Sequence, residues 1–299
     1  MKIIDAISTS GPFYSLEFFP PKEREQWPHF FRTVEKLDRL NPLFVSVTYG
    51  AGGNTQGNTL EITSRLAQTG YRPMAHLTCI GAESAGLKEY VGKLAESGVN
   101  NILALRGDVP IQTVIDWDCC EFAHASDLVR FLHSEFPEFG IGVAGYPTPH
   151  PESPSFAADR QATADKLNAG SDFCITQLFF DPREYFEYVA QMRLLGIHKP
   201  IMPGVLPIQS LESLRRVLAM SGCHIPAKLL LEVEEADKNG GQAAVREVGI
   251  AYAVGQIQAL LNGGAPGIHL YTLNMADLCL RIAEEVGSLQ TRNSENANL

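Results

Sequence analysis

The chain has 299 residues, a length that suits two domains or one large α/β barrel of about 250 residues. Its 24 Lys and Arg residues against 34 Asp and Glu residues give a net charge of −10, which argues against a nucleic acid or an anionic membrane surface as partner. The sequence shows neither an export leader nor an apolar run near the roughly 20 residues of a membrane span. The six cysteines lack C-x-x-C spacing, so we expect reduced thiols and no metal site. Together these features predict a cytoplasmic protein that acts on small molecules.

Short runs of apolar, β-branched or aromatic residues recur along the chain and predict eight strands. They cover residues 14–18, 44–48, 74–78, 101–105, 141–144, 173–177, 201–205 and 267–271. Between them, apolar residues recur at helical spacing, and several of these segments close on a glycine. The predicted helices cover residues 27–40, 59–68, 87–96, 126–133, 156–168, 183–195, 210–220, 228–236, 242–261 and 274–286.

The alternation of strands and helices predicts an α/β fold with a single (β/α)8 TIM barrel over residues 1–287. An extra helix precedes the last predicted strand, and residues 288–299 form a polar tail that we expect to fray. An open, doubly wound sheet stays as the alternative fold.

One carboxylate, Glu17, lies within a strand-like apolar stretch, Ser15 to Pro21, that ends in two prolines. Its leucine and aromatic neighbours predict burial, which disfavours the charged form of a carboxyl. We therefore expect a raised pKa and a proton held near neutral pH, as a general acid requires. By residue type alone, an exposed Glu on the polar side of a half-buried strand is the more common situation.

Polar residues follow nearly every predicted strand, at the end where a barrel gathers its catalytic loops. They are Glu17, Thr48, His76, Thr78, Arg106, Asp108, Tyr146, His150, Thr176, Gln177, Tyr271, Thr272 and Asn274. Gly107 adds backbone freedom for the close approach of a ligand. Single polar residues are common at strand ends, but a ring of them predicts a binding site.

Seven segments in order resemble one known family. They are Ser-Leu-Glu-Phe-Phe-Pro-Pro (15–21), Val-Ser-Val-Thr-Tyr-Gly (45–50), His-Leu-Thr-Cys (76–79), Ala-Leu-Arg-Gly-Asp (104–108), Ile-Thr-Gln with Phe-Phe-Asp (175–177 and 179–181), and residues 203–207 and 269–274. In this order they resemble methylenetetrahydrofolate reductases over residues 14–287. The resemblance implies a barrel flavoprotein that binds FAD and serves methionine biosynthesis. It would reduce 5,10-methylenetetrahydrofolate to 5-methyltetrahydrofolate with NADH or NADPH in a ping-pong cycle. We also expect a homo-oligomer.

The resemblance also assigns roles to single residues. Glu17 would be the general acid that opens the methylene bridge, and Asp108 would act in catalysis beside the flavin and the pterin. Gln177, Asp108 and Tyr271 would bind the folate substrate. Contacts to FAD would come from Thr48, His76, Leu105, Arg106, Gly107, Asp108, Tyr146, His150, Asp159 and Lys166, with Lys166 placed to pair with the diphosphate.

Several positions depart from the family pattern. Ala162 and Asp165 stand where relatives often carry Asn and Arg, which removes a phosphate partner and adds a negative charge. His124 replaces a tyrosine that contacts flavin, and Val217 replaces an aromatic residue that stacks on substrate. Met275 stands where many relatives have an Arg that can hold folate carboxylates.

The predicted strand ends lack the residues that three other classes of barrel enzyme require. No predicted strand ends in a Lys for a Schiff base, no His-x-His occurs, and no pair of cysteines lies at strand ends. Aldolase, metallohydrolase and zinc methyltransferase chemistry are therefore disfavoured. Two alternatives stay open: another flavin or folate barrel that acts on a different one-carbon carrier, and a folate-binding subunit with weak turnover.

Overall fold

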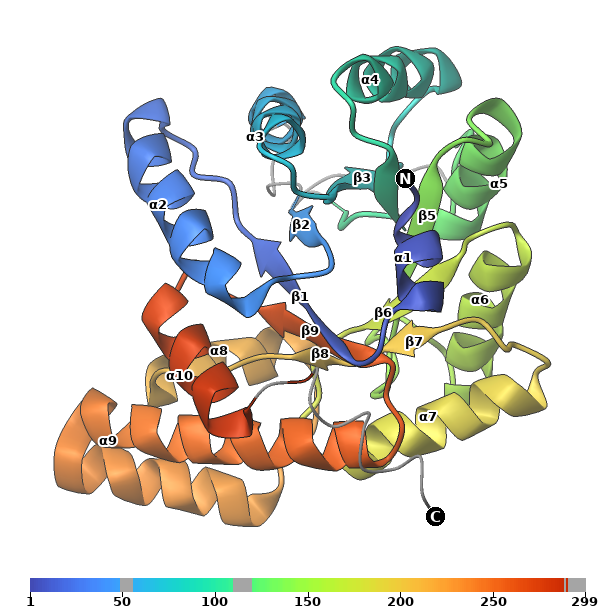
Figure 1. Cartoon of the computed structure of the whole chain (residues 1–299). Helices are drawn as coiled ribbons and strands as arrows, with labels where there is room; N and C mark the ends of the chain where they lie inside the picture. The colour runs from blue at the N-terminus through green and yellow to red at the C-terminus, as the bar shows by residue number, and fades with distance from the viewer. Residues whose placement is uncertain (49–55, 110–119, 288, 290–299) are drawn as a thin grey trace.

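In the part of the chain that the structure describes, nine parallel strands form one curved sheet with helices packed around its outer face (Figure 1). The computed structural model describes residues 1–48, 56–109, 120–287 and 289. Its strands are β1 (Phe13–Phe18), β2 (Val45–Val47), β3 (Pro73–Thr78), β4 (Asn101–Leu105), β5 (Gly140–Gly145), β6 (Phe173–Thr176), β7 (Ile201–Met202), β8 (Gly204–Val205) and β9 (Gly267–Tyr271). Its helices are α1 (Ile3–Thr9), α2 (Trp27–Leu37), α3 (Gln56–Gln68), α4 (Ser84–Glu96), α5 (Ala125–Glu135), α6 (Phe156–Asn168), α7 (Pro182–Leu194), α8 (Leu211–Ser221), α9 (Ala227–Asn262) and α10 (Ala276–Val286), with short 3-10 helices η1 (Arg24–Gln26) and η2 (Asp38–Leu40).

The strand order confirms the barrel. It runs β7-β6-β5-β4-β3-β2-β1-β9-β8, which follows the chain without the central reversal of a doubly wound sheet. The predicted strand 201–205 is two short strands, because Pro203 has no N–H to donate to a ladder. β7 pairs with β6 and β8 pairs with β9, so this one segment joins the two edges of the sheet.

The predicted helices are confirmed to within about one turn at each end. The predicted helix 27–40 is an α-helix followed by the 3-10 helix η2. The two helices predicted before the last strand run together as α9, but Gly241 has non-helical φ and ψ of 61° and −154°. Figure 1 shows that the chain of α9 turns back on itself. The predicted tail, residues 288–299, lies outside the described residues except for Leu289, which is buried.

The sequence analysis did not predict α1. This seven-residue helix is too short for its apolar spacing to stand out. The backbone N–H of Ile3 donates to Oδ1 of Asn101 at 2.8 Å, next to the start of β4. Ile3 and Ile7 pack on residues inside the barrel, including Phe173. The helix therefore closes the end of the barrel where the strands begin.

The barrel interior changes from apolar to polar along its axis. Near α1, Phe13, Phe44 and Phe173 pack in one buried cluster. Successive side chains of a strand alternate between faces, so Ser15 and then Glu17 follow Phe13 on the inner face of β1. Tyr14 and Leu16, the residues between them, point outward and pack in a second apolar cluster that includes residues of the surrounding helices. The fold thus places a single carboxylate, Glu17, beyond an apolar base.

A tyrosine reaches over β8 near the strand ends and connects the strands on either side of the segment β7–β8. The hydroxyl of Tyr271, at the end of β9, donates to the carbonyl of Thr176, at the end of β6, at 2.7 Å. A Cβ at Gly204 would lie 2.4 Å from the Thr176 carbonyl and 2.6 Å from the Tyr271 ring. Gly204 is therefore the residue whose missing side chain makes room for the ring.

We expect Gly204→Ala to destabilise the protein by roughly 1–3 kcal/mol, because the added methyl must displace the backbone of β6 or the Tyr271 ring. Urea titration of purified protein would measure the change. Gly86→Ala is the matched control: nothing lies within 4 Å of its Cβ position in α4, so this variant should gain roughly 0.5–1 kcal/mol. Equal stability of the Gly204→Ala variant and the wild type would contradict the packing described.

Candidate active site

Glu17 is the centre of a buried polar cluster inside the barrel. Its side chain lies opposite Ser46 of β2 and Tyr271 of β9 in the strand register. Its Oε2 lies 3.4 Å from Nε2 of His76, 3.4 Å from Nε2 of His269, and accepts a long hydrogen bond of 3.5 Å from the Ser46 hydroxyl. Only 6% of Glu17 is exposed, which confirms the predicted burial of this residue.

Two histidines determine the charge of Glu17. Burial raises the pKa of its carboxyl, but the imidazoles of His76 and His269 outweigh burial and lower the pKa to about 2. The expected raised pKa is therefore wrong for this structure. The sequence shows aromatic neighbours, whereas the histidines come from β3 and β9, which are distant in the chain. Glu17 is an anion between two imidazoles.

His269 is a site residue that the sequence analysis missed. It is fully buried, and its Nδ1 lies 2.8 Å from the Ser15 hydroxyl, opposite it in the register of β1 and β9. Its ring stacks on Phe44 and meets the edge of Tyr271. The period-two alternation of β9, which places His269 and Tyr271 on one face, is the signal that could have found it.

The loop after β9 fixes the backbone around Glu17. The Thr272 hydroxyl donates to the Glu17 carbonyl at 2.6 Å. The side-chain amide of Asn274 accepts from the N–H of Phe19 at 3.1 Å and donates to its carbonyl at 2.8 Å. Leu273 and Asn274 have positive φ of 48° and 57°, a conformation that the surrounding contacts must hold. The loop after β9 therefore holds the backbone of the segment that carries Glu17.

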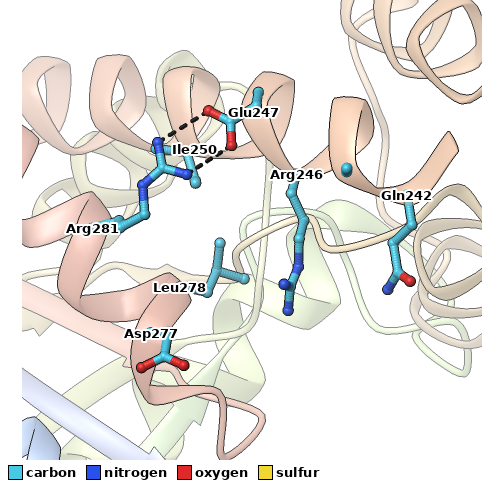
Figure 2. Close-up of a pocket in the computed structure, with 8 residues that line it drawn as sticks. Gln242, Arg246, Glu247, Ile250, Asp277, Leu278 and Arg281 are labelled. Carbon is cyan, nitrogen blue, oxygen red and sulfur yellow. Dashed lines mark hydrogen bonds and ion pairs between the residues drawn. The ribbon is translucent and has the colours of Figure 1, made fainter. Parts of the chain in front are cut away.

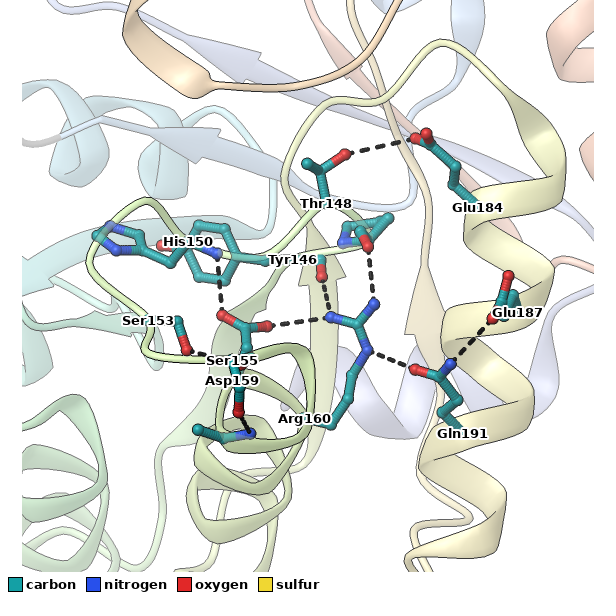
Figure 3. A network of polar contacts seen from close by, with 12 residues as sticks. Tyr146, Thr148, His150, Ser153, Ser155, Asp159, Arg160, Glu184, Glu187 and Gln191 are labelled. Atoms are coloured by element: carbon teal, nitrogen blue, oxygen red, sulfur yellow. Dashed lines mark hydrogen bonds and ion pairs between the residues drawn. The ribbon is translucent and has the colours of Figure 1, made fainter.

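A second group of predicted residues surrounds the end of β5 (Figure 3). The rings of Tyr146 and His150 meet edge to face at 5.1 Å. Lys166 lies 5.6 Å from the Tyr146 ring and donates to the carbonyl of Ala144 at 2.6 Å, and burial lowers the pKa of its ammonium. Asp159 is buried and accepts from the N–H of His150 at 3.0 Å. The structure thus brings these four predicted residues together.

Tyr271 lies near both groups. Burial, then the Glu17 carboxylate and then Tyr146, raise the pKa of the Tyr271 hydroxyl well above its usual range. Burial, followed by Asp159 and Asp108, raises the pKa of Tyr146 to about 12. Asp108 itself is exposed. These electrostatic contacts connect the Glu17 cluster with the residues after β4 and β5.

The other predicted residues occupy the same end of the barrel. Arg106 makes an ion pair of 2.7 Å with Glu152, so the loops after β4 and β5 are joined. Gly107 has φ of 90°, and a Cβ there would lie 2.9 Å from Ile80. Gln177 accepts from the N–H of the next residue through its own Oε1.

Two remaining residues are buried or partly buried near the inner surface. Thr48 accepts a hydrogen bond from Thr59 of α3 at its carbonyl, 3.2 Å away. Leu105 packs against the apolar cluster inside the barrel.

Three of the departures from the family pattern lie on or just before helices α5 and α6, and a fourth, Met275, follows Asn274 and donates its N–H to the Thr272 carbonyl at 2.8 Å. Ala162 and Asp165 are exposed on α6, and Asp165 accepts a hydrogen bond from Gln161. His124 precedes α5, where its N–H donates to Asp127 at 2.8 Å. Met275 packs partly against the apolar residues outside the barrel.

Comparison with known proteins shows the family. A family model for methylenetetrahydrofolate reductase matches residues 2–287. The chain belongs to the methylenetetrahydrofolate reductase family. It is 36% identical over 290 residues to a probable methylenetetrahydrofolate reductase (NADPH) of Caenorhabditis elegans, covering 94% of this chain and 43% of that protein. It is 34% identical over 274 residues to the 5,10-methylenetetrahydrofolate reductase of Pectobacterium carotovorum, covering 91% and 89%.

The chain spans about half the length of several of these reductases. The share is 43% for the protein of Caenorhabditis elegans and 51% for methylenetetrahydrofolate reductase (NADH) 1 of Arabidopsis thaliana. Among solved structures, a Clostridium thermocellum protein that binds two copies of 5-methyl-5,6,7,8-tetrahydrofolic acid is similar with a TM-score of 0.65, covering 94% of this chain and 96% of that one. At 13% identity this likeness supports the fold alone.

In this member of the methylenetetrahydrofolate reductase family, a surface pocket of about 330 Å³ lies outside the barrel, between α9 and α10. Figure 2 shows Arg246 directed into it, while Arg281 is held by Glu247. None of the residues predicted for the active site lines this pocket. This pocket is therefore separate from the polar residues at the strand ends.

The described parts of the chain contain neither a group of metal ligands nor a helix suited to a membrane. Within residues 1–48, 56–109 and 120–287, no three His, Cys, Asp or Glu side chains are grouped as metal ligands. No helix in those same ranges combines the length and apolar character that crossing a membrane requires.

The charge of Glu17 predicts a pH effect on stability. Its folded pKa of about 2 lies below the ordinary value of 4.5, so the unfolded chain takes up this proton first as the pH falls. The stabilisation is complete above pH 4.5 and is lost towards pH 2. The Glu17→Gln variant lacks this contribution. When the pH is lowered from about 5 to about 3, the unfolding free energy of the variant should therefore decrease less than that of the wild type.

Urea titration at each pH measures this difference, and Glu25→Gln, in the exposed turn η1, is the control. Equal losses for Glu17→Gln and the wild type would show that Glu17 is not held as an anion in the folded protein.

Proposed function

We propose that this chain reduces 5,10-methylenetetrahydrofolate to 5-methyltetrahydrofolate, with NADH or NADPH as electron donor and FAD as cofactor. The observation that carries the proposal is the buried carboxylate of Glu17 at the strand ends, within a chain of the reductase family. Relatives are named for either nicotinamide, so both donors are proposed. The assembly as a homo-oligomer and the cytoplasmic location are part of the same proposal.

The residues at the strand ends suit FAD in their chemistry. Arg106, with 23% of its side chain exposed, is a forked donor of the kind that binds phosphate oxygens. Tyr146 and His150 offer aromatic surface, with the buried Lys166 ammonium beside them. When bound, FAD would carry two electrons from nicotinamide to folate, which amino-acid side chains cannot do. Thr48, His76, Leu105, Gly107, Asp108 and Asp159 complete the proposed contacts.

The chemistry of the substrate explains the need for Glu17. Its methylene carbon bridges two nitrogens and becomes a good electrophile only when one C–N bond opens, which requires a proton on the leaving nitrogen. Glu17 is the acid proposed to supply it. Because the pKa of Glu17 is lowered to about 2, the proposed step needs a proton to reach this carboxylate first. His76 and His269 are the side chains in contact with it, each 3.4 Å from Oε2.

The folate would be held by polar groups around this acid. Gln177 has an amide that can both donate and accept, which suits the mixed edge of a pterin. Tyr271 would form the floor of the site, since its hydroxyl is committed to Thr176. Asp108, exposed after β4, would accept pterin N–H groups and place a negative charge near the flavin.

Glu17→Gln separates the two halves of the proposed reaction. We expect the variant to bind FAD and to accept electrons from NADH or NADPH as the wild type does, because that half needs no proton from Glu17. Oxidation by methylenetetrahydrofolate should slow by roughly a hundredfold or more. Anaerobic stopped-flow absorbance in the flavin bands measures both halves. A similar loss in both would show that Glu17 supports the fold and not the proton transfer, and Glu25→Gln is the control.

Asp108→Asn tests the electrostatic role of the loop after β4. Removing a negative charge near the flavin should make electron uptake easier, so the midpoint potential of the bound FAD should rise. Spectroelectrochemical titration measures the potential, and folate turnover should fall in the same variant. An unchanged potential would place Asp108 away from the flavin.

The purified protein also distinguishes the alternative functions. A protein that stays colourless after incubation with FAD, yet binds folate, would favour the folate-binding subunit. Flavin that nicotinamide reduces but methylenetetrahydrofolate does not oxidise would favour a different one-carbon substrate.

A further inference from the structure

Arg160 is a buried cation to which the sequence analysis gave no role. Only 7% of its side chain is exposed, although it lies on α6 behind the strand ends. Its Nε donates to Oε1 of Gln191 on α7 at 2.7 Å, and its guanidinium lies 4.7 Å from the ring of Tyr188. The side chain is therefore fixed between two helices, and its planar fork has a defined direction.

The fork of Arg160 points at the loop after β5, as Figure 3 shows. Nη1 donates to the carbonyl of Tyr146 at 2.7 Å, and Nη2 donates to the carbonyl of Pro147 at 2.8 Å. Nη1 also lies 3.2 Å from Oδ2 of Asp159, whose Oδ1 accepts from the N–H of His150. Arg160 and Asp159 together thus hold three backbone groups of the loop 146–150.

These contacts act on the two aromatic rings through the backbone. Tyr146 and His150 pack edge to face, and neither ring is held by Arg160 directly. Hydrogen bonds from a buried cation to carbonyls are strong, and a carbonyl left without its donor in a buried place is unfavourable. Without Arg160, the loop would lose the contacts that fix where both rings lie.

The guanidinium of Arg160 is engaged by protein groups and is not placed to bind a ligand. Each of its three nitrogens already donates to a protein acceptor, and its charge is balanced by the adjacent Asp159. Asp159, proposed above as a contact to FAD, has both carboxylate oxygens engaged in the same network. Any effect of Arg160 on the cofactor must therefore pass through the loop 146–150 or through Asp159.

We propose that Arg160 is a positioning residue that preorganises the loop 146–150 for the cofactor. The proposal rests on the proposed function, because FAD is the ligand that Tyr146 and His150 are thought to meet. A loop that is already ordered does not lose conformational entropy when the ligand binds. If the loop were no longer preorganised, binding would become weaker although no contact to the ligand had been removed.

The first test measures loop order without any cofactor. Arg160→Met keeps an apolar stem of similar length but leaves the carbonyls of Tyr146 and Pro147 without a donor. Hydrogen exchange followed by mass spectrometry on the FAD-free protein should show faster exchange in residues 146–153. Arg193→Met is the matched control, since Arg193 of α7 also donates to two carbonyls, those of Ile197 and Lys199 in the loop after this helix. In this control variant, exchange should become faster in residues 195–200 instead.

The second test measures FAD binding by quenching of flavin fluorescence. Arg160→Met should raise the Kd for FAD by about tenfold or more, while Arg193→Met should leave it near the wild-type value. Arg160→Lys keeps the charge but loses the fork, so it should give an intermediate Kd. This milder variant also keeps the test available if Arg160→Met does not fold.

Three results would overturn the proposal. Unchanged exchange in residues 146–153 would show that Arg160 does not order the loop. Faster exchange with an unchanged Kd would show that loop order does not matter for FAD. An equal rise in Kd for Arg193→Met would show a general loss of stability. Failure of the wild type to bind FAD would instead overturn the proposed cofactor, while the exchange data would still decide whether Arg160 orders the loop.

Discussion

The contact of one buried carboxylate with two buried imidazoles is the interaction on which the catalytic end of this barrel depends. An ionised group inside a protein is stable only when charges and hydrogen bonds replace its hydration. Here β1 supplies Glu17, β3 supplies His76 and β9 supplies His269, so the contacts around the carboxylate form only when these strands come together in the sheet. The apolar base of the barrel excludes water from below, which makes each of these contacts stronger than it would be at the surface.

The supporting structure follows from the same need for fixed geometry. Thr272 and Asn274 hold the backbone beside Glu17, and Tyr271 reaches over β8 to Thr176. On the other side, Arg160 and Lys166 bind carbonyls at and just after the end of β5. Thr272 and Asn274 join the last βα unit to the first, whereas Arg160 and Lys166 of α6 hold the strand end and the loop of their own unit. The strand ends therefore form a rigid rim, as sites that depend on exact orientation require.

Much of this could be predicted from the chain. Period-two and helical patterns predicted the barrel and nearly every element, and the structure brings most of the predicted strand-end residues to one end of it. The sign of the Glu17 pKa shift could not be predicted, because it depends on His269, which is distant in the chain but adjacent in the sheet. The sequence analysis gave Arg160 no role, because two of its acceptors are backbone carbonyls, which a sequence does not distinguish. The helix α1 was missed because seven residues give too little periodicity.

The break at Pro203 has a consequence for motion. The strands β7 and β8 each pair with one neighbour over only two residues, whereas other neighbouring strands pair over three to five. Few ladder hydrogen bonds mean a low free energy of local opening, so this seam is where the barrel should open first without unfolding as a whole. The hydrogen bond from Tyr271 to Thr176 lies across the same seam. A ligand that binds against Tyr271 would therefore also hold this seam closed. Local opening of the barrel at β7 and β8 should be slower when the ligand is bound.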